Sequence, residues 1–397
     1  MKILYIHNEY HQLSGEEHAS REIVSLLKSH GHEVRWFTRT TVGKENVLWF
    51  KFKAFFTGIS NPWIRKDLKK ILDEFKPDIC MVQNLYPFIS TSIFKVLKER
   101  GIPVAMRCPN YRLFCPNGLC LNPRGEVCEK CWGKGHEWHC IINNCEGSLG
   151  KSIGYAARNA FNRITKVIKN GVDCFVVQSN FQKNKFISQD IPEDHVKVLA
   201  GLLPEIGEME QKESGEWVSF VGRVSMEKGI DEFVEAARML PDIPFRVAGK
   251  IDENYVVPSN LPKNLEFMGF ISGDDLNNFY LNSKIIVIPS KWYEGFPNTI
   301  LRAMLLKRPV ITTNIGAMQS IIEDHKTGIL VPPGDSQALM EAVRELYNDE
   351  QNISKYAMAG YDKATTMYSR GQIYNDLMEI FNVAIKNSRN SDTLNNP

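Results

Sequence analysis

The 397-residue chain is predicted to be an α/β protein built from two Rossmann-like domains. Short apolar runs typical of buried strands alternate with helical patterns along its whole length, which favours parallel sheets covered by helices on both faces. The alternation is interrupted at residues 201–216, a segment with five acidic residues and little apolar content. We therefore expect an N-terminal domain over residues 1–200, a linker over 201–216, a C-terminal domain over 217–368, and a final helix and tail over 369–397.

The N-terminal half opens with an apolar strand pattern, and a helical pattern follows that Gly31 ends. Later apolar runs in this half are short and nearly continuous, as in strands that are buried on both faces of a sheet. Predicted strands lie at residues 2–6, 33–38, 78–82, 103–106, 173–178 and 196–199, and predicted helices lie at 17–30 and 90–100.

The C-terminal half repeats the same alternation after the acidic segment. Its last helical pattern is followed by a polar tail from residue 387, which we expect to be frayed. Predicted strands lie at residues 217–221, 245–248, 265–268, 285–288 and 309–312, and predicted helices lie at 231–240, 274–281 and 369–386 and from 298 onward.

Bulk composition excludes several classes of protein. A net charge of +2 argues against a general nucleic-acid binder, so we expect no nucleic acid among the partners. The N-terminal sequence lacks the apolar core and the cleavage site of a secretory signal, and no apolar run approaches the roughly 20 residues of a spanning helix. We therefore expect a cytoplasmic protein.

The loop after the first strand also lacks the G-x-G-x-x-G spacing of a dinucleotide-dependent oxidoreductase.

Residues 284–335 hold the most informative pattern in the chain. An apolar strand run ends in Pro-Ser, a glycine and the acid Glu294 follow, and a helical pattern begins at Asn298. Ligands of open parallel sheets bind at such strand-to-helix turns, where helix N-termini offer N–H groups to phosphate. Because a carboxylate beside them accepts hydrogen bonds from hydroxyls, the turn suits a phosphorylated, hydroxyl-rich ligand such as a nucleotide sugar.

A second strand-to-helix turn, within residues 217–228, has the composition of a phosphate loop. The strand runs into Gly222 and Arg223, and Lys228 precedes a helix. Glycine lets the backbone approach a ligand, arginine offers a planar fork to phosphate, and lysine supplies a mobile charge. The alternative for this loop alone is a solvated turn with two surface cations.

Several ordered motifs resemble one family, the retaining GT-B glycosyltransferases of the group 1 or family 4 type. The resemblance extends over nearly the whole chain. The N-terminal half also looks like a bacterial branch of the family, one with a cysteine-rich insert. The C-terminal half carries it in FVGRVSMEKGID, WYEGFPNTIL, PVITTNIG and TGILVPPGD, and the N-terminal half in HNEYHQLSGEEHASREIVSLLKSHGHEV, KPDICMVQNLYPFIS and NYRLFCPNG.

The resemblance implies two domains facing a cleft, with a nucleotide-diphosphate sugar on the C-terminal domain and a glycan or lipid-linked acceptor on the N-terminal one. It implies sugar transfer with retention of anomeric configuration in cell-surface polysaccharide biosynthesis, and no cofactor for catalysis. The implied catalytic residues are Arg223, Lys228 and Glu294; the donor-binding residues are Gly222, Arg223, Lys228, Glu294, Gly295, Phe296, Asn298, Thr299 and Arg302; the acceptor side contains Ser14, Gly15, Gln83 and Asn110.

The sequence departs from the family pattern at ligand positions. Arg302 stands where a glutamate usually holds the nucleoside ribose, and arginine cannot accept hydrogen bonds from hydroxyls. Either the ribose is held otherwise, or Arg302 contacts phosphate, or donor binding is weakened. Pro109 replaces a histidine, for which His7 and His18 are substitutes to consider. The alternative function is a catalytically weakened pseudo-glycosyltransferase that binds a sugar or a partner.

Seven of the nine cysteines lie between residues 108 and 145. Thiolates at C-x-x-C spacing suit tetrahedral zinc, and this segment has too little apolar content to fold on its own. We expect a structural zinc, with His136 and His139 as alternative ligands; free thiols, or disulfides in an oxidising compartment, are the other reading. The expected ligands are four of Cys115, Cys128, Cys131, Cys140 and Cys145.

Residues 47–70 contain six cations, one acid and interleaved tryptophan and phenylalanine side chains. Such a mixture suits the headgroup boundary of a bilayer, so the protein is expected to be peripheral on the inner face of the membrane. The alternative is an ordinary helix that packs its aromatic face on the core.

Overall fold

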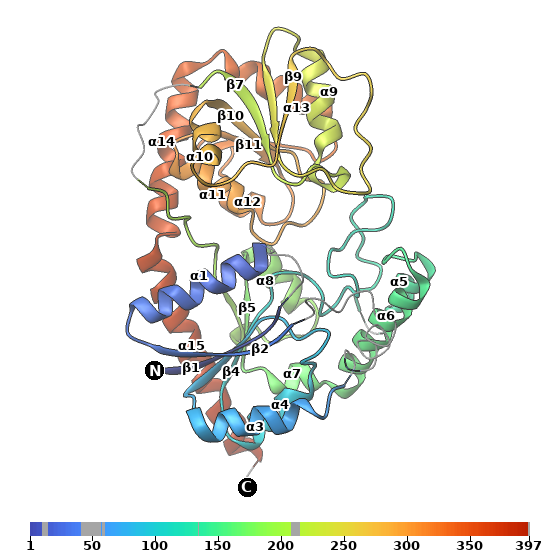
Figure 1. The fold of residues 1–397 in the computed structure, drawn as a ribbon, viewed down its shortest axis with the longest axis vertical. Coiled ribbons are helices and arrows are strands. Elements are labelled where there is room, and N and C mark those ends of the chain that lie inside the picture. Colours follow the sequence, from blue (N-terminus) through green and yellow to red (C-terminus); the bar gives the residue numbers. More distant parts are fainter. Residues whose placement is uncertain (10–14, 41–56, 58–59, 134, 208–214, 396–397) are drawn as a thin grey trace. The chain divides into compact units, whose positions relative to one another are not determined.

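The computed structural model describes residues 1–9, 15–40, 57, 60–133, 135–207 and 215–395 (Figure 1). The chain divides into two compact units, each with a six-stranded sheet. Unit 1 contains Met1–Pro123, Cys128–Ala200 and Ile373–Pro397, and unit 2 contains Arg124–Val127 and Gly201–Gln372. Within the described ranges, no helix is both long enough and apolar enough to cross a lipid bilayer.

The sheet of unit 1 contains β1 (Lys2–Glu9), β2 (Glu33–Thr40), β3 (Ile79–Val82), β4 (Val104–Arg107), β5 (Cys174–Val177) and β6 (Val196–Val198). Their order is β2-β1-β3-β4-β5-β6, and all neighbours are parallel. β1 pairs with β2 from Lys2 opposite Glu33 to Glu9 opposite Thr40. The strand order reverses between β1 and β3, so the loops after these strands leave toward opposite faces.

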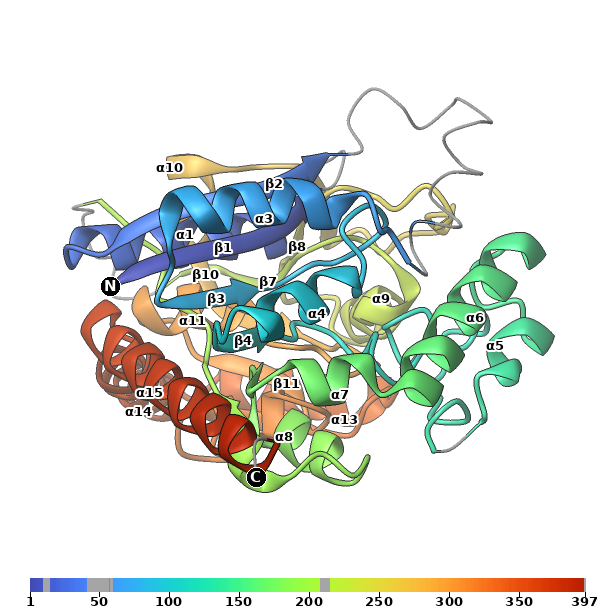
Figure 2. The same ribbon diagram turned by 90° about the horizontal axis from the view of Figure 1, so that it is seen from below.

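The helices of unit 1 are α1 (Gly15–Ser29), α3 (Ile64–Phe75), α4 (Ser92–Glu99), α5 (Trp138–Ile142), α6 (Leu149–Thr165), α7 (Val167–Gly171), α8 (Asn180–Ile187), the 3-10 helix η1 (Glu193–His195) and most of α15 (Arg370–Asn395). α1 covers one face of the sheet, and α3, α4 and α7 cover the other (Figures 1 and 2). Leu68, Leu72 and Phe94 pack there against strand residues in one apolar core.

The sheet of unit 2 contains β7 (Trp217–Val221), β8 (Phe245–Ala248), β9 (Leu265–Gly269), β10 (Ser283–Ile288), β11 (Val310–Thr313) and β12 (Gly328–Val331). The strands are parallel and their order is β12-β11-β10-β7-β8-β9. If the strands are counted along the chain from β7, their order across the sheet from β9 to β12 is 3-2-1-4-5-6, which is the Rossmann order. The switch point of this sheet therefore lies between β7 and β10.

The helices of unit 2 are the 3-10 helix η2 (Met226–Lys228), α9 (Ile230–Met239), α10 (Gly273–Leu281), α11 (Asn298–Leu305), α12 (Met318–Ile321), α13 (Ser336–Tyr347) and α14 (Glu350–Met367). α9 and α13 pack together on one face of the sheet, and α11 and α14 pack together on the other (Figure 1). Two parallel sheets covered by helices confirm the predicted α/β class.

The structure contains several elements that were not predicted. Helix α5 lies within the cysteine-rich segment, and α6 and α7 follow it. The other elements that were not predicted are β12, α3, α12, α13 and α14. The tail was expected to fray from residue 387, but α15 continues to Asn395, because the chain between Gln372 and Asn395 contains neither glycine nor proline to end it. Asn387 also donates to the backbone oxygen of Asp173 at 3.0 Å, which fixes the helix on unit 1.

Candidate active site

The carboxyl ends of β7 and β10 lie side by side at the switch point of the sheet in unit 2. β7 leads into Gly222 and η2, and β10 leads through residues 289–297 into α11. The two loops leave toward opposite faces, and the space between such loops is where ligands of this sheet type bind. The two segments that the sequence singles out as ligand-binding are thus brought together.

Two glycines allow the segments at this point to approach closely. Gly229 has φ 77°, and a Cβ there would lie 1.9 Å from the carbonyl oxygen of Pro289. Gly316 has φ 60°, and a Cβ there would lie 3.2 Å from Cα of Tyr293. Any side chain at Gly229 would therefore push η2 away from the end of β10, and with it Lys228.

Lys228 and Glu294 form the centre of the site. The Lys228 ammonium lies 2.5 Å from Oε1 of Glu294, and the same oxygen accepts hydrogen bonds from Ser290 Oγ at 2.8 Å and Trp292 Nε1 at 2.9 Å. The ammonium also lies 5.3 Å from the centroid of the Trp292 ring. Oε2 receives none of these three bonds, so it remains an acceptor for a ligand hydroxyl.

The Glu294 side chain is ionised in this environment. The residue is only 7% exposed, and burial by itself would raise the pKa of its carboxyl. The charge and hydrogen bond of Lys228, together with the hydrogen bonds from Ser290 and Trp292, outweigh burial and lower the pKa below its usual range. The site therefore holds an oriented carboxylate next to a cation at neutral pH.

Arg223 adds a second cation at the same edge of the sheet. Its Nη1 donates to Asp252 Oδ2 at 2.9 Å, and its Nη2 pairs with Glu227, which also accepts from Ser225 Oγ at 2.7 Å. The pKa of Asp252 is lowered, chiefly by the backbone N–H of Asn254 and then by Arg223. Since a guanidinium has five N–H donors, Arg223 retains donors for a phosphate.

The first turn of α11 offers backbone donors beside this cluster. The first N–H groups of a helix lack intrahelical partners, and no side chain caps α11 at Pro297. Such a turn attracts anions. It contains the predicted donor residues Asn298 and Thr299, and Gly295 and Phe296 lie shortly before it.

Arg302 is not part of the Glu294 cluster. Its Nη1 donates to Oδ1 of Asn277, a buried residue of α10. The structure therefore connects this unusual arginine to the packing of α10 on α11. Its predicted part in donor binding stays a prediction.

Sequence reasoning missed three residues that shape the site. Ser290 and Trp292 orient Glu294, and Gly316 lies against the backbone of residues 293 and 294. Ser290 and Trp292 precede Glu294 in the segment that the sequence already marks, so their hydrogen-bonding capacity was the available signal. Gly316 gave no such signal in the sequence, because its role depends on β11 lying beside β10.

On the acceptor side, Gln83 serves the interior of unit 1. It lies directly after β3, and its Oε1 accepts from Tyr5 Oη at 2.6 Å and Arg107 Nη1 at 3.1 Å. Its Nε2 donates to the backbone oxygen of Glu16 at 3.1 Å. Gln83 thus ties α1 to β1 and β4 through a buried polar network.

The other predicted acceptor residues are spread over unit 1. Gly15 is the first residue of α1, and Asn110 accepts from the backbone N–H of Arg112 at 3.0 Å. Ser14 lies outside the described residues.

A polar cavity lies between α1 and the carboxyl ends of β1 and β2. Its volume is about 330 Å³. His7 is 2% exposed, and neither of its ring nitrogens has a hydrogen-bond partner. Burial lowers the pKa of His7 to about 4, so the ring is neutral at neutral pH. His18 is exposed on α1 and does not line the cavity. The lining residues are His7, Glu9, Glu17, Ser20, Arg21, Trp36 and Thr38.

Two of the predicted metal ligands, Cys140 and Cys145, hydrogen-bond to each other, and Cys115 hydrogen-bonds to Cys120, which was not a predicted ligand. The Cys120 thiol lowers the pKa of Cys115 to about 7 through such a bond, and the Cys140 thiol lowers that of Cys145. Burial raises the pKa of Cys131 to about 12. Among the described residues, no three His, Cys, Asp or Glu side chains form a group that could hold a metal ion. The arrangement thus does not fit zinc as it stands, and zinc stays a prediction.

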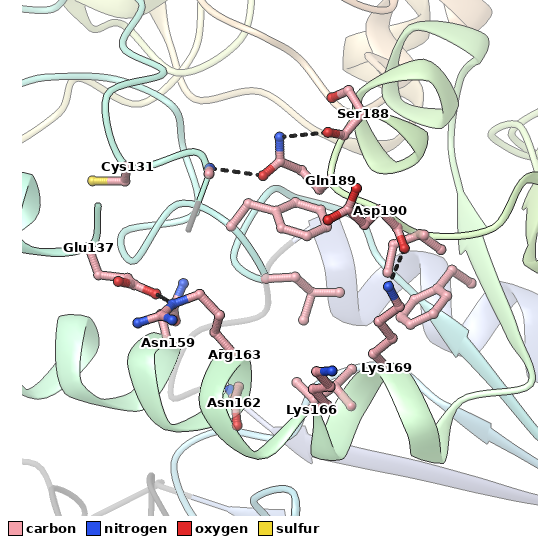
Figure 3. Close-up of a pocket in the computed structure, with 16 residues that line it drawn as sticks. Cys131, Glu137, Asn159, Asn162, Arg163, Lys166, Lys169, Ser188, Gln189 and Asp190 are labelled. Carbon is pink, nitrogen blue, oxygen red and sulfur yellow. Dashed lines mark hydrogen bonds and ion pairs between the residues drawn. The ribbon is translucent and has the colours of Figure 1, made fainter. Parts of the chain in front are cut away.

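Figure 3 shows another cavity of unit 1, of about 270 Å³, between the cysteine-rich segment, α6 and α7. Arg163 points toward Glu137 across it, with Nε 2.6 Å from the carboxylate, and Lys169 donates to the backbone oxygen of Asp190. Arg163 and Lys169 are therefore engaged by groups of the protein itself.

The basic aromatic segment at residues 47–70 lies largely outside the described residues. Its described part continues into α3, where Ile64 and Leu68 are buried in the core of unit 1 and Trp63 is exposed. The described part thus packs as an ordinary amphipathic helix. A membrane contact of the remainder stays a prediction.

Two Rossmann-like units in one chain are the architecture of the GT-B fold. Residues 205–363 match the family described as glycosyl transferases group 1. The matched residues all lie within unit 2, and the match supports a transferase.

Two relatives give the context of the chain. It is 25% identical over 327 residues to an uncharacterised 42.6 kDa protein in the cps region of Klebsiella pneumoniae, an alignment of 80% of this chain and 77% of that protein. It is 29% identical over 180 residues to the capsular polysaccharide biosynthesis glycosyltransferase CapM of Staphylococcus aureus. That alignment covers 43% of this chain and less than half of CapM, 47%.

Solved structures share the fold over nearly the full length. Sucrose-phosphate synthase from Thermosynechococcus elongatus superposes with a TM-score of 0.67 at 16% identity, covering 96% of this chain and 98% of that one. HepE of Anabaena in complex with UDP superposes with a TM-score of 0.61 at 15% identity, covering 96% and 99%. These likenesses confirm the predicted GT-B fold.

Proposed function

We propose that this chain is a glycosyltransferase that transfers a sugar from a nucleotide-diphosphate sugar to a glycan or lipid-linked acceptor. The observation that carries the proposal is the meeting of Lys228, Glu294 and Arg223 at the switch point of unit 2. The UDP bound to HepE, a protein of the same fold, supports the donor class. The name of CapM supports a place in capsular or other cell-surface polysaccharide synthesis.

In this proposal the donor diphosphate lies at the N-terminus of α11, with Arg223 and Lys228 as its cations. Negative charge grows on the diphosphate as the sugar departs, and cations held in advance at that position lower the barrier. Oε2 of Glu294 accepts a hydrogen bond from a sugar hydroxyl, while Ser290 and Trp292 keep the carboxylate oriented.

The proposed reaction exchanges one bond for another at the anomeric carbon. The bond to the diphosphate oxygen breaks, and its electron pair stays on the leaving group. The acceptor hydroxyl oxygen forms the new bond on the same face, which retains the configuration, and its proton passes to the departing diphosphate. Retention rests on the family resemblance.

For the acceptor, we infer that the cavity beside His7 holds one sugar residue. A neutral imidazole has one donor and one acceptor, which matches a hydroxyl group that also does both. The Trp36 ring, 6.4 Å from the His7 ring, offers an apolar surface to the C–H face of a sugar. The cavity volume of about 330 Å³ lies at the small end of the range for ligand pockets.

The test is a screen of the purified protein against UDP-, GDP-, ADP- and dTDP-sugars, with a membrane extract as the source of acceptor. We expect release of the nucleoside diphosphate from one donor, and release should depend on the extract. If well-folded protein releases none from any donor and binds none, the transferase proposal fails and a sugar- or partner-binding protein takes its place. Arg302→Glu separates the two further, because a gain in donor binding would indicate a decayed ribose site.

A further inference from the structure

Helices α5 and α6 lie side by side at the edge of unit 1 (Figure 2), and both expose large apolar side chains. In α6, Leu149, Ile153 and Ile164 are spaced by four and eleven residues, which places them on one side of the helix. In α5, Trp138 and Ile142 are four residues apart. The exposed fractions are 57% for Leu149, 41% for Ile153, 68% for Ile164, 48% for Trp138 and 70% for Ile142.

The polarity of α6 is inverted relative to an ordinary surface helix, which buries its apolar side. Here Ser152, Arg158 and Asn159 are buried instead. The Arg158 guanidinium lies 4.5 Å from the ring centroid of Tyr86 and donates to the backbone oxygen of Pro116 at 2.8 Å. Asn159, Asn162 and Arg163 line the cavity of Figure 3. These polar contacts fix the rotation of α6, so its leucine and isoleucine side chains face outward.

The charge around the hairpin indicates what covers this apolar side. Residues 143–172 contain five cations and one acid, Glu146. Arg158, Arg163 and Lys169 bond to groups of the protein itself, whereas Lys151 and Lys166 are exposed. A second copy of the chain would bring like charges together across a shared apolar face. An anionic lipid surface would attract each exposed lysine and also accept the apolar side chains.

We propose that the α5–α6 hairpin docks unit 1 on an anionic lipid bilayer. The helices lie in the plane of the headgroups, with Ile142, Leu149, Ile153 and Ile164 at the acyl boundary and Trp138 at headgroup level. This surface is separate from residues 47–70, and it uses no group of the donor site or of the His7 cavity.

The test is flotation of the purified full-length chain with phosphatidylcholine vesicles, with and without phosphatidylglycerol. We expect the wild-type chain to float with the anionic vesicles, and increasing NaCl should release it. The triple variant Leu149→Gln, Ile153→Gln and Ile164→Gln should bind at least about tenfold more weakly, because three apolar side chains are lost from the lipid boundary. The pair Lys151→Gln and Lys166→Gln should bind anionic vesicles about tenfold more weakly.

The matched control replaces two exposed apolar residues of unit 2, Val256→Gln and Phe270→Gln, whose exposed fractions are 87% and 74%. This control should bind vesicles like the wild-type chain. The proposal is wrong if the wild-type chain ignores anionic vesicles, or if the folded triple variant binds them equally well. A wild-type dimer in sedimentation that the triple variant dissociates would assign the surface to a second copy. No donor or acceptor is needed, so this outcome is independent of the proposed transferase activity.

Discussion

The ammonium of Lys228 lies 2.5 Å from Oε1 of Glu294, although 66 residues separate them in the sequence. The pair joins the loop after β7 to the loop after β10, and each charge compensates the other in a partly buried site. When a diphosphate binds, Lys228 can turn to the phosphate oxygens, because Ser290 and Trp292 continue to hold the carboxylate. One contact thus stabilises the site before a donor binds and prepares it for one.

Replacing Glu294 with Gln should reduce both sugar transfer and stability. Loss of an oriented charge at a reacting centre lowers turnover by about 10²-fold. The free energy of unfolding should fall by about 1–3 kcal/mol, because Lys228 is left beside a neutral amide. Turnover assays and urea unfolding check the two effects. The control is Glu235→Gln, whose partner Arg238 is exposed on α9, and it should change neither.

Gly229→Ala should destabilise unit 2 by about 3 kcal/mol, since the new Cβ would collide with the backbone of Pro289 at a positive φ. Thermal unfolding measures this effect. Gly371→Ala is the matched control, because nothing lies within 4 Å of a Cβ there and the residue is in α15. The control should keep its stability or gain slightly. Equal effects at both positions would contradict the close packing of η2 on β10.

His7→Leu should make the protein less sensitive to acid. The pKa of His7 is about 4 in the folded chain and about 6.5 when unfolded, so below pH 6.5 the unfolded chain binds the proton first. The stability associated with neutral His7 is therefore complete above about pH 6.5 and declines as the pH falls toward 4. The leucine variant lacks this decline, which urea unfolding at pH 7 and pH 4.5 would show.

The same variant should lose acceptor binding while it keeps donor binding. Leucine cannot hydrogen-bond a sugar hydroxyl, so affinity for methyl glycosides should fall about tenfold. Removing a buried polar group without a partner should leave the melting temperature unchanged or higher. A large loss of stability at pH 7 would instead show that His7 is a packing residue.

Arg302 and Asn277 should be coupled. Arg302→Ala leaves the buried Asn277 amide without its donor, which should cost about 1 kcal/mol of folding stability. A double-mutant cycle with Asn277→Ala should give a coupling energy of about 0.5–1 kcal/mol. No coupling, together with a large loss of donor affinity in Arg302→Ala, would place this arginine on the donor instead.

The cysteine-rich segment has two descriptions that a metal analysis separates. The spacing of the cysteines predicts about one zinc ion per chain held by four thiolates. In the structure, thiols hydrogen-bond in pairs, and no group of three metal-binding side chains occurs among the described residues. Elemental analysis of protein purified without chelator decides between them. Bound zinc that is lost in Cys128→Ser would support the first, and metal-free, fully reactive thiols would support the second.

Much of the fold was predictable because the strands of parallel sheets are short, apolar and regularly spaced. The segments around Gly222 and Glu294 could be recognised separately, since each combines a strand end with residues that suit phosphate or hydroxyls. Their contact could also be anticipated, because both strands end at one edge of the same sheet. The three donors on one oxygen of Glu294 could not, as they depend on side-chain rotation.

Two features of unit 1 were beyond sequence reasoning for physical reasons. The inverted polarity of α6 arises because Arg158 and Asn159 bond to distant backbone groups, so the pattern alone would place its apolar side in the core. The cavity beside His7 depends on the register of β1 and β2, which sets His7 opposite Thr38, and on α1 passing over both strands. A single histidine in an apolar strand gives no sign of this.

The most direct measurement is calorimetric titration of the wild-type chain and of Lys228→Ala with UDP, GDP, ADP and dTDP. We expect one nucleoside diphosphate to bind the wild-type chain and to bind Lys228→Ala at least about tenfold more weakly, because a charge-assisted contact to phosphate is lost. If no nucleotide binds, or if the affinity is the same in Lys228→Ala and Arg223→Ala as in the wild-type chain, the donor site does not lie between β7 and β10.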